Sequence, residues 1–217
     1  METNNQQKKK NTYKKEYQMI QSSVSRELLH GMVVSRLASA LGAELGLSEK
    51  ECYDLALAGL LHDIGKLELA KMVNAIEGNT LIIEDMRYIR SHSTLSAEIL
   101  EKKGYSQDII DMVKFHHENC DGTGYPSNLT REEIPLGAKI IRVCDVFAAL
   151  TANRVYRKAF DIPTAIELMI EEAKYYDIRV FLAFMNLANR PDIREILDVS
   201  SLEDSLLQKD EKEFTLS

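Results

Sequence analysis

The chain has 217 residues, of which 45% are hydrophobic and 28% are charged, values typical of a globular protein. Its formal net charge of −7 argues against binding to long nucleic acids, although a local positive pocket for a small anion is compatible with it. No apolar run reaches the roughly 18 residues that cross a membrane, and three scattered cysteines predict a reducing, cytoplasmic location without a disulfide framework.

The hydrophobic pattern is helical almost throughout, and no segment alternates convincingly as a strand. Apolar side chains recur at helical spacing over residues 24–45, and Gly46 ends this first predicted helix. Ser48 and Glu51 form a capping box that opens the next helix, which extends to about His62. Residues 66–81 are expected to be irregular. The later predicted helices cover residues 83–103, 106–117, 136–150, 163–175 and 177–189.

The chain has only five histidines, and two of them are adjacent in the sequence HHENCDGTGYP at 116–126. Adjacent side chains on a helix point about 100° apart, so a shared packing role for His116 and His117 is not expected. The other three histidines are predicted to lie within helices or at their ends; they are His30, His62 and His92.

A cluster of divalent metal ions explains these histidines better than separate roles. Successive residues at a helix end, followed by a glycine turn, can each direct an imidazole to one cluster. Asp63 can bridge two metals with its two oxygens. Asp145 lies in the apolar sequence VCDVFAAL, where an unpaired carboxylate is costly to bury. Each histidine taken alone fits a core or surface role, but the whole set favours a metal site.

Five motifs together resemble the HD-GYP family, a branch of the HD-domain metal-dependent phosphohydrolases. The resemblance covers roughly residues 24–188, and HD followed by HHExxDGxGYP is specific where HD alone would be weak. The motifs are HDIGK at 62–66, SHSTLSAEIL at 91–100, HHENCDGTGYP at 116–126, IPLGAKIIRVCDVFAALT at 134–151 and RVYRKA at 154–159. The resemblance implies an all-α bundle of about seven to eight helices at 21–190, between a basic polar tail at 1–20 and an acidic segment at 191–217.

The resemblance also implies hydrolysis of cyclic di-GMP, a bacterial second messenger, at a site that holds iron or manganese. By motif, the implied metal ligands are His30, His62, Asp63, His92, His116, His117 and Asp145. Lys66 matches a lysine that contacts the substrate phosphate, and the positions that line the nucleotide site are Tyr125, Arg154 and Arg157. For the three cationic residues the alternative is a solvated surface charge, and the alternative for Tyr125 is packing of the turn.

These residue types suit an anionic phosphodiester. Two divalent cations carry more positive charge than the carboxylates of Asp63 and Asp145 offset. The site therefore stays positive and attracts a phosphate. Such cations lower the pKa of a bound water and polarise a phosphoryl oxygen, and the residues assigned to catalysis are Asp63 and Lys66. Imidazole with carboxylate fits iron, manganese or zinc, and the residue types alone do not choose among these metals.

Two positions depart from the family pattern. Ala148 stands where the family usually has a second aspartate, three residues after Asp145. Arg26 stands where members with three metals have a glutamate. A guanidinium has no lone pair to give a metal, so two metals are expected rather than three.

Two functions from different classes therefore stay open. The first is an active phosphodiesterase that opens cyclic di-GMP or a related cyclic dinucleotide. The second is a catalytically weak or inactive receptor that binds the nucleotide and signals to a partner. The intact ligand set favours the first and Ala148 the second, while the GYP turn argues against simple phosphomonoester hydrolysis. The candidate protein partners are a second copy of the chain or a separate regulatory protein.

Overall fold

The computed structural model describes residues 24–68, 90–153 and 157–200. Within these ranges the regular secondary structure is helical, and an isolated β-bridge pairs Asp121 with Thr130. The all-α prediction is therefore confirmed. In the same ranges, every helix is too short or too polar to cross a membrane.

The helices lie close to the predicted positions. A first helix covers residues 24–44, and a short one at 64–68 follows a two-residue turn. The labelled helices are α2 (Glu49–Leu61), α5 (His92–Lys102), α6 (Gln107–Lys114), α7 (Leu136–Thr151), α8 (Ile162–Glu171), α9 (Ile178–Ala188) and α10 (Ile193–Leu197), with a 3-10 turn at Ala173–Tyr175.

Local capping explains where several helices begin and end. Gly46 ends the first helix with a φ of 76°, a left-handed conformation that glycine adopts without strain. The capping box at the start of α2 is present, because the Ser48 side chain accepts from the Glu51 amide and the Glu51 carboxylate accepts from the Ser48 amide. The side chains of Asp161 and Asp177 cap α8 and α9 by accepting hydrogen bonds from backbone amides of the first helical turn.

One boundary differs from the sequence prediction, and it matters for function. The helix that was expected to end near His117 stops at Lys114, and the residues that follow form a turn. The Glu118 amide donates to the Phe115 carbonyl at 2.9 Å, which closes this turn. The paired histidines therefore lie on a tight turn after α6 rather than on its last helical residues.

Several predictions fall partly outside the described residues. Residues 66–68, expected to be irregular, are helical, whereas 69–81 are not described. The whole polar tail at 1–20 and the start of the helix expected at 83–103 also lie outside the described residues. The domain boundaries stay predictions, although Ile193 of α10 is only 5% exposed and packs into the core beyond the expected limit at residue 190.

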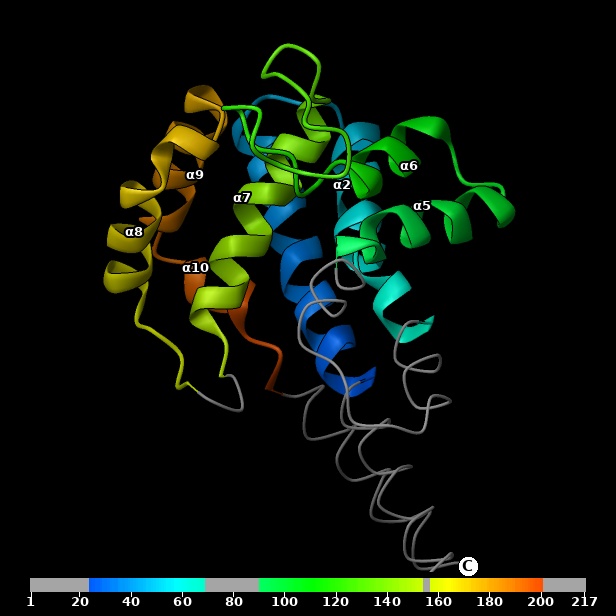
Figure 1. The fold of residues 1–217 in the computed structure, drawn as a ribbon. Coiled ribbons are helices and arrows are strands. Elements are labelled where there is room, and N and C mark those ends of the chain that lie inside the picture. Colours follow the sequence, from blue (N-terminus) through cyan, green and yellow to red (C-terminus); the bar gives the residue numbers. More distant parts are fainter. Residues whose placement is uncertain (1–23, 69–89, 154–156, 201–217) are drawn as a thin grey trace, which may run out of the picture.

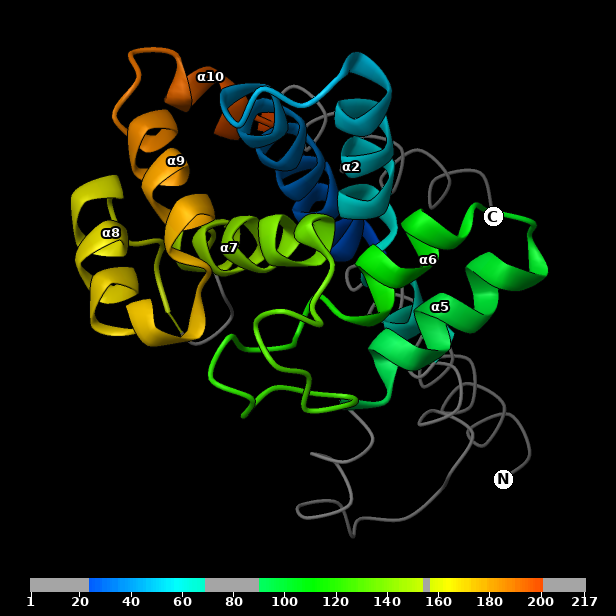
Figure 2. The ribbon, with the colours of Figure 1, turned by 90° about the horizontal axis from the view of Figure 1, so that it is seen from above.

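Helix α7 is the central element of the bundle. It packs against α6 and α2 on one side and against α8 and α9 on the other (Figure 1). Seen from above, α7 lies between these two groups, and the loop that precedes it covers one end of the bundle (Figure 2). Helix α7 therefore borders both the core and the region where α2 and α6 end and α5 begins.

The core is apolar and continuous across these helices. Leu37 and Leu41 of the first helix are fully buried, at the spacing of one helical turn. Phe147 of α7 packs edge-on against Phe184 of α9, with ring centroids 4.9 Å apart. This packing fixes the position of α7 and hence of the carboxylate that it contributes to the site.

Candidate metal centre

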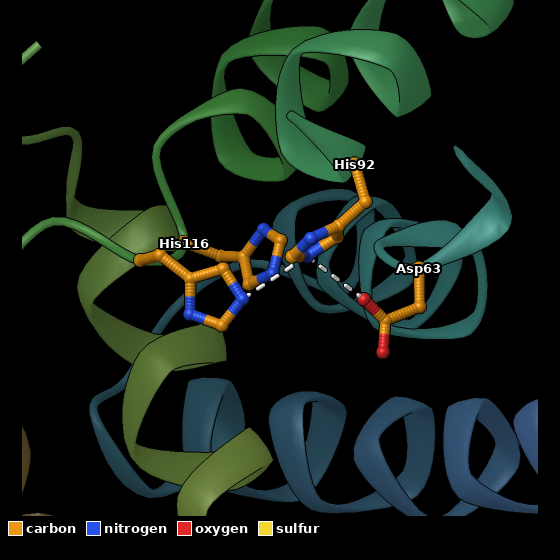
Figure 3. A group of neighbouring side chains, drawn as sticks. Asp63, His92 and His116 are labelled. Atoms are coloured by element: carbon orange, nitrogen blue, oxygen red, sulfur yellow. Dashed lines mark hydrogen bonds and ion pairs between the residues drawn. The ribbon is translucent and has the colours of Figure 1, made fainter. Parts of the chain in front are cut away.

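All seven side chains predicted to ligate metal gather around one centre. They come from the first helix (His30), the turn after α2 (His62 and Asp63), the first residue of α5 (His92), the turn after α6 (His116 and His117) and α7 (Asp145). Figure 3 shows Asp63, His92 and His116 directed toward one another from separate elements. Segments that are far apart in the sequence thus meet at their functional groups.

Asp63 lies at the middle of this centre. Its Oδ1 atom is 3.1 Å from Nε2 of His92, and its Oδ2 atom is 3.2 Å from Nε2 of His62. Oδ2 is also 4.0 Å from Nε2 of His30, which in turn lies 2.9 Å from Oδ1 of Asp145. The two oxygens of Asp63 therefore face different histidines, as a carboxylate that bridges two cations requires.

The donor atoms form three overlapping groups, each with all its atoms within 4.8 Å of one another. The groups are Asp63, His92, His116 and His117; His30, His62 and Asp63; and His62, His116 and Asp145. Imidazole nitrogens and carboxylate oxygens are suitable ligands for divalent transition metals. Because each group shares at least one residue with another, they describe one extended centre rather than separate sites.

Hydrogen bonds to backbone carbonyls orient two of the buried imidazole rings for metal ligation. Nδ1 of His62 donates to the Gly59 carbonyl at 2.8 Å, and Nδ1 of His116 donates to the Val113 carbonyl at 2.6 Å. Both rings therefore turn Nε2 toward the centre, where Nε2 of His62 faces the Asp63 carboxylate and Nε2 of His116 has no hydrogen-bond partner among the described residues. A buried nitrogen without a partner is costly, and a metal ion would satisfy it. The residues present thus fit a metal cluster.

The charges of the centre fit this role at the two carboxylates and at His116 and His117, whereas His62 would have to release a proton before it could ligate a metal. Burial would lower the pKa of His62, but the nearby carboxylates of Asp63 and Asp145 outweigh it and raise the pKa to about 10. Burial would raise the pKa values of both carboxyls, but the neighbouring histidines hold them well below the usual range. Burial lowers the pKa of His116 well below its usual range and that of His117 to about 3, so both rings keep a lone pair for a metal.

Lys66 lies at the edge of the centre. Its ammonium group forms an ion pair with Oδ2 of Asp63, three residues earlier, and lies 3.8 Å from Oε2 of Glu27. Burial would lower the pKa of Lys66, but the carboxylates of Asp63 and Glu27 outweigh it and raise the pKa. The side chain is 35% exposed, so its positive charge is accessible at the mouth of the centre.

Tyr125 covers another side of the centre. Its ring stacks on that of His117, with centroids 4.7 Å apart and planes 27° apart. The guanidinium of Arg90 lies over the Tyr125 ring, 5.4 Å from its centroid. The packing role considered for Tyr125 is therefore present, and it places a phenol directly beside a predicted metal ligand.

Glu118 holds the loop that carries Tyr125. It is 2% exposed, and its carboxylate accepts hydrogen bonds from the amides of Ser127 and Leu129 at 2.6 and 3.0 Å. Gly124 lies so close to this segment that a Cβ atom there would be 2.4 Å from Cα of Glu118. The glycines and the glutamate of the motif thus close the loop against the turn that bears the paired histidines.

The two arginines predicted to contact substrate have different outcomes. Arg154 lies outside the described residues. Arg157 donates from Nη2 to the Ala149 carbonyl at 2.9 Å and from Nη1 to the Leu150 carbonyl at 3.1 Å. Its guanidinium also lies 4.3 Å from the ring centroid of Phe160. The structure therefore brings Arg157 to the carboxyl end of α7, and its role in substrate binding stays a prediction.

Sequence reasoning assigned no role to three residues that border this centre: Arg90, Glu118 and Arg142. Arg90 and Glu118 lie within or beside quoted motifs, but their contacts depend on how the loop folds. Arg142 had a visible signal, because a charged residue interrupts the apolar sequence IIRVCDV. The argument that singled out Asp145 in this helix applies equally to Arg142.

Known proteins match both the sequence and the fold. A cyclic di-GMP phosphodiesterase of Pseudomonas aeruginosa is 36% identical over 158 residues, which is 72% of this chain and 38% of that protein. A 3'3'-cGAMP-specific phosphodiesterase of Vibrio cholerae is 34% identical over 142 residues, 65% of this chain and 31% of that protein. The chain thus spans less than half the length of these curated relatives.

Solved structures show the same fold at lower identity. A crystal structure of a cyclic GMP-AMP specific phosphodiesterase of V. cholerae has a TM-score of 0.62 and 17% identity, covering 87% of this chain and 53% of that one. An HD-GYP-type protein of Bdellovibrio bacteriovorus has a TM-score of 0.58 and 23% identity, covering 74% and 52%. The family model described as HD domain matches residues 11–180. The chain therefore belongs to the HD-domain family, as its HD-GYP motifs predict.

Proposed function

We propose that this chain is a metal-dependent phosphodiesterase that opens cyclic di-GMP, or a related cyclic dinucleotide, to a linear product. The observation that carries the proposal is the convergence of seven buried or half-buried donors in three overlapping groups, with the accessible charge of Lys66 at their edge. Relatives named cyclic di-GMP and 3'3'-cGAMP phosphodiesterases support this substrate class.

The site is proposed to hold two divalent cations, iron or manganese. The seven donors would hold them, with Asp63 between His30 and His62 on one side and His92 and His117 on the other, and with His116 and Asp145 beside His62. When bound, such cations supply a nucleophilic hydroxide near neutral pH and polarise the phosphoryl oxygen. Arg26 is exposed and offers no lone pair, which supports two cations rather than three.

The residues of the chain position the substrate at this centre. Lys66 keeps its proton at neutral pH and places a positive charge where a phosphate would enter. Tyr125 also keeps its proton, because burial raises its pKa to about 12, so its hydroxyl is a hydrogen-bond donor beside His117. Asp63 holds both His62 and Lys66 through its carboxylate, which fixes the distance between the metal ligands and the phosphate-binding charge.

Product analysis tests this proposal. Protein purified anaerobically with iron or manganese is incubated with cyclic di-GMP and with 3'3'-cGAMP, and the nucleotides are separated by chromatography. The expected result is a linear dinucleotide or its mononucleotides from at least one of them. Tight binding of both without any linear product, across both metals, would contradict the proposal and favour the receptor function.

The location and the protein partners are also proposals. Cys52, Cys120 and Cys144 are all unpaired, which supports a reducing compartment such as the cytoplasm. The candidate partners are a second copy of this chain or a separate regulatory protein. Size-exclusion chromatography with light scattering, at several protein concentrations, tests whether the chain pairs with itself.

Arg157→Ala is expected to reduce stability more than substrate binding. The guanidinium donates to carbonyls at the carboxyl end of α7, where the helix dipole also stabilises a positive charge. Losing these contacts should lower the free energy of unfolding by about 1 kcal/mol, and the melting temperature by about 2–4 °C. Thermal melting and KM are measured together. An unchanged melting temperature with a raised KM would instead support the predicted substrate role.

The receptor alternative rests on Ala148, and Ala148→Asp tests it. Residues 145 and 148 share a helix face with Cβ atoms roughly 5–6 Å apart. Ala148 is 2% exposed, and the buried Nδ1 of His30 has no hydrogen-bond partner among the described residues, so a donor is available near Asp145. The new carboxylate should raise turnover about tenfold, because a hydrogen bond to a metal ligand typically changes activity by about that factor.

The control for Ala148→Asp is Ala148→Asn, which has nearly the same shape without the charge and should give a smaller gain. Metal content is determined in the same samples, so that a change in rate is not a change in loading. If the native protein turns over faster than Ala148→Asp, the site is adapted to alanine. Ala148 would then no longer favour the receptor function.

A further inference from the structure

Arg142 is a cation that the metal centre does not use. It lies on α7 one helical turn before Asp145, in a stretch whose other side chains are largely apolar. The residue is partly buried, and its Nε atom is buried without a hydrogen-bond partner among the described residues. Removing a guanidinium from water without a compensating partner costs free energy, so its retention here calls for a partner.

The hydrogen bond that Arg142 makes is to a neutral group. Its Nη2 donates to the side-chain Oδ1 of Asn119 at 3.1 Å, and the side-chain Nδ2 of Asn119 donates to Oγ1 of Thr123 at 3.1 Å. Within the part of the chain that the structure describes, no carboxylate forms an ion pair with Arg142. Asn119 therefore tethers the guanidinium to the loop that carries Tyr125 and leaves its charge uncompensated.

The position of this charge is next to the proposed substrate site. The hydrogen-bond partner of Arg142, Asn119, is two residues after the predicted ligand His117, and Arg142 itself lies one helical turn before the predicted ligand Asp145. Arg142 belongs to none of the three donor groups, so it lies beside the metal ligands rather than among them.

We propose that Arg142 binds a phosphate of the substrate, namely the phosphodiester of the cyclic dinucleotide that is not being cleaved. The inference rests on the proposed function, because a cyclic dinucleotide carries a second phosphodiester that needs a counter-charge away from the metals. A guanidinium presents several N–H donors in a fixed fork that matches phosphate oxygens. Asn119 occupies Nη2, which orients the fork and leaves Nη1 for the ligand.

Arg142→Gln tests this inference on the metal-loaded protein. The affinity for cyclic di-GMP should fall about tenfold to 100-fold, as expected for a charged hydrogen bond. The affinity should also become less sensitive to salt. Hydrolysis of bis(p-nitrophenyl) phosphate, which has a single phosphodiester, is measured in parallel. The loss of kcat/KM for cyclic di-GMP should exceed the loss for this small substrate at least tenfold.

Three further variants keep the test decisive. Arg142→Lys retains the positive charge without the fork of N–H donors and should bind cyclic di-GMP better than Arg142→Gln. It replaces Arg142→Gln in the comparison with native protein if the glutamine variant does not fold. Arg179→Gln removes an exposed arginine on α9 and should bind like the native protein. Asn119→Ala removes the tether, together with the hydrogen bond to Thr123, and leaves the guanidinium in place. If it weakens binding as much as Arg142→Gln does, the arginine only supports the loop and the inference is overturned.

Binding and turnover are measured separately, so that the two proposals can fail separately. Native protein that binds cyclic di-GMP without opening it contradicts the phosphodiesterase but leaves the comparison of affinities valid. Equal affinities of native protein and Arg142→Gln overturn the role of Arg142, however fast the turnover. Native protein that binds no cyclic dinucleotide overturns both proposals.

Discussion

Asp63→Asn is expected to lose most of its bound metal and more than about 100-fold of its cyclic-dinucleotide hydrolysis, because even outer contacts to metal ligands are typically worth about 10–100-fold. Asp63 belongs to two of the three donor groups, and each of its oxygens faces a different histidine. Asparagine keeps the shape but replaces one oxygen with a donor nitrogen. Metal content by mass spectrometry and rates with cyclic di-GMP measure the effect.

The matched control is Asp54→Asn on α2. Asp54 is also a buried carboxylate, but it pairs with Lys50 at 2.6 Å and lies outside the three donor groups. This variant should keep its metal and its activity. Circular dichroism should show native helicity for both variants. Native metal content in Asp63→Asn would mean that the bridging position assigned to this carboxylate is wrong.

Gly65→Ala is expected to destabilise the protein and to reduce metal binding together. A Cβ atom at Gly65 would lie 2.4 Å from the His92 carbonyl oxygen and 2.8 Å from the Ser96 amide nitrogen. Helix α5 must therefore move, and His92 moves with it relative to Asp63. Such overpacking typically costs about 1–3 kcal/mol, or roughly 2–10 °C in melting temperature. Calorimetry and metal content are the two measurements.

Gly104→Ala separates the loss of stability from the loss of metal. Gly104 follows α5 with a φ of 78°, and a Cβ atom there would meet nothing within 4 Å. Its substitution strains the backbone by about 1–2 kcal/mol, within the range expected for Gly65→Ala. Only Gly65→Ala should lose metal. Equal metal content in the two variants would show that the close approach of α5 does not set the position of His92.

Local signals in the sequence predicted most of the fold. The capping box at Ser48 and Glu51, the left-handed Gly46 and the cap at Asp177 involve residues within four positions of one another, so their outcome does not depend on distant contacts. The end of α6 was less predictable, because the turn at Phe115 is closed by backbone hydrogen bonds that any residue can make.

The candidate site was predictable where residue type alone limits the chemistry. Few roles suit an imidazole pair such as His116 and His117, so a metal site could be proposed from the residues, and the resemblance to the HD-GYP family implied the ligand set. A cation has more alternatives. Arg157 fits either a phosphate or a helix end, and the structure places it on the carbonyls of α7. Arg142 required knowledge of burial, which depends on how α7 packs against the loop.

The ion pairs around Asp63 have a consequence for the order in which the protein is assembled. Within the chain, Lys66 pairs with Asp63 and His30 pairs with Asp145, while His62 lies 3.2 Å from Asp63 and 3.7 Å from Asp145. A zinc finger, by contrast, stays unfolded until its metal arrives. Because the carboxylates of this bundle have partners within the chain, we expect it to fold first and to take up metal afterwards. Supply of metal would then set how much of the folded pool is active, rather than how much of the chain folds.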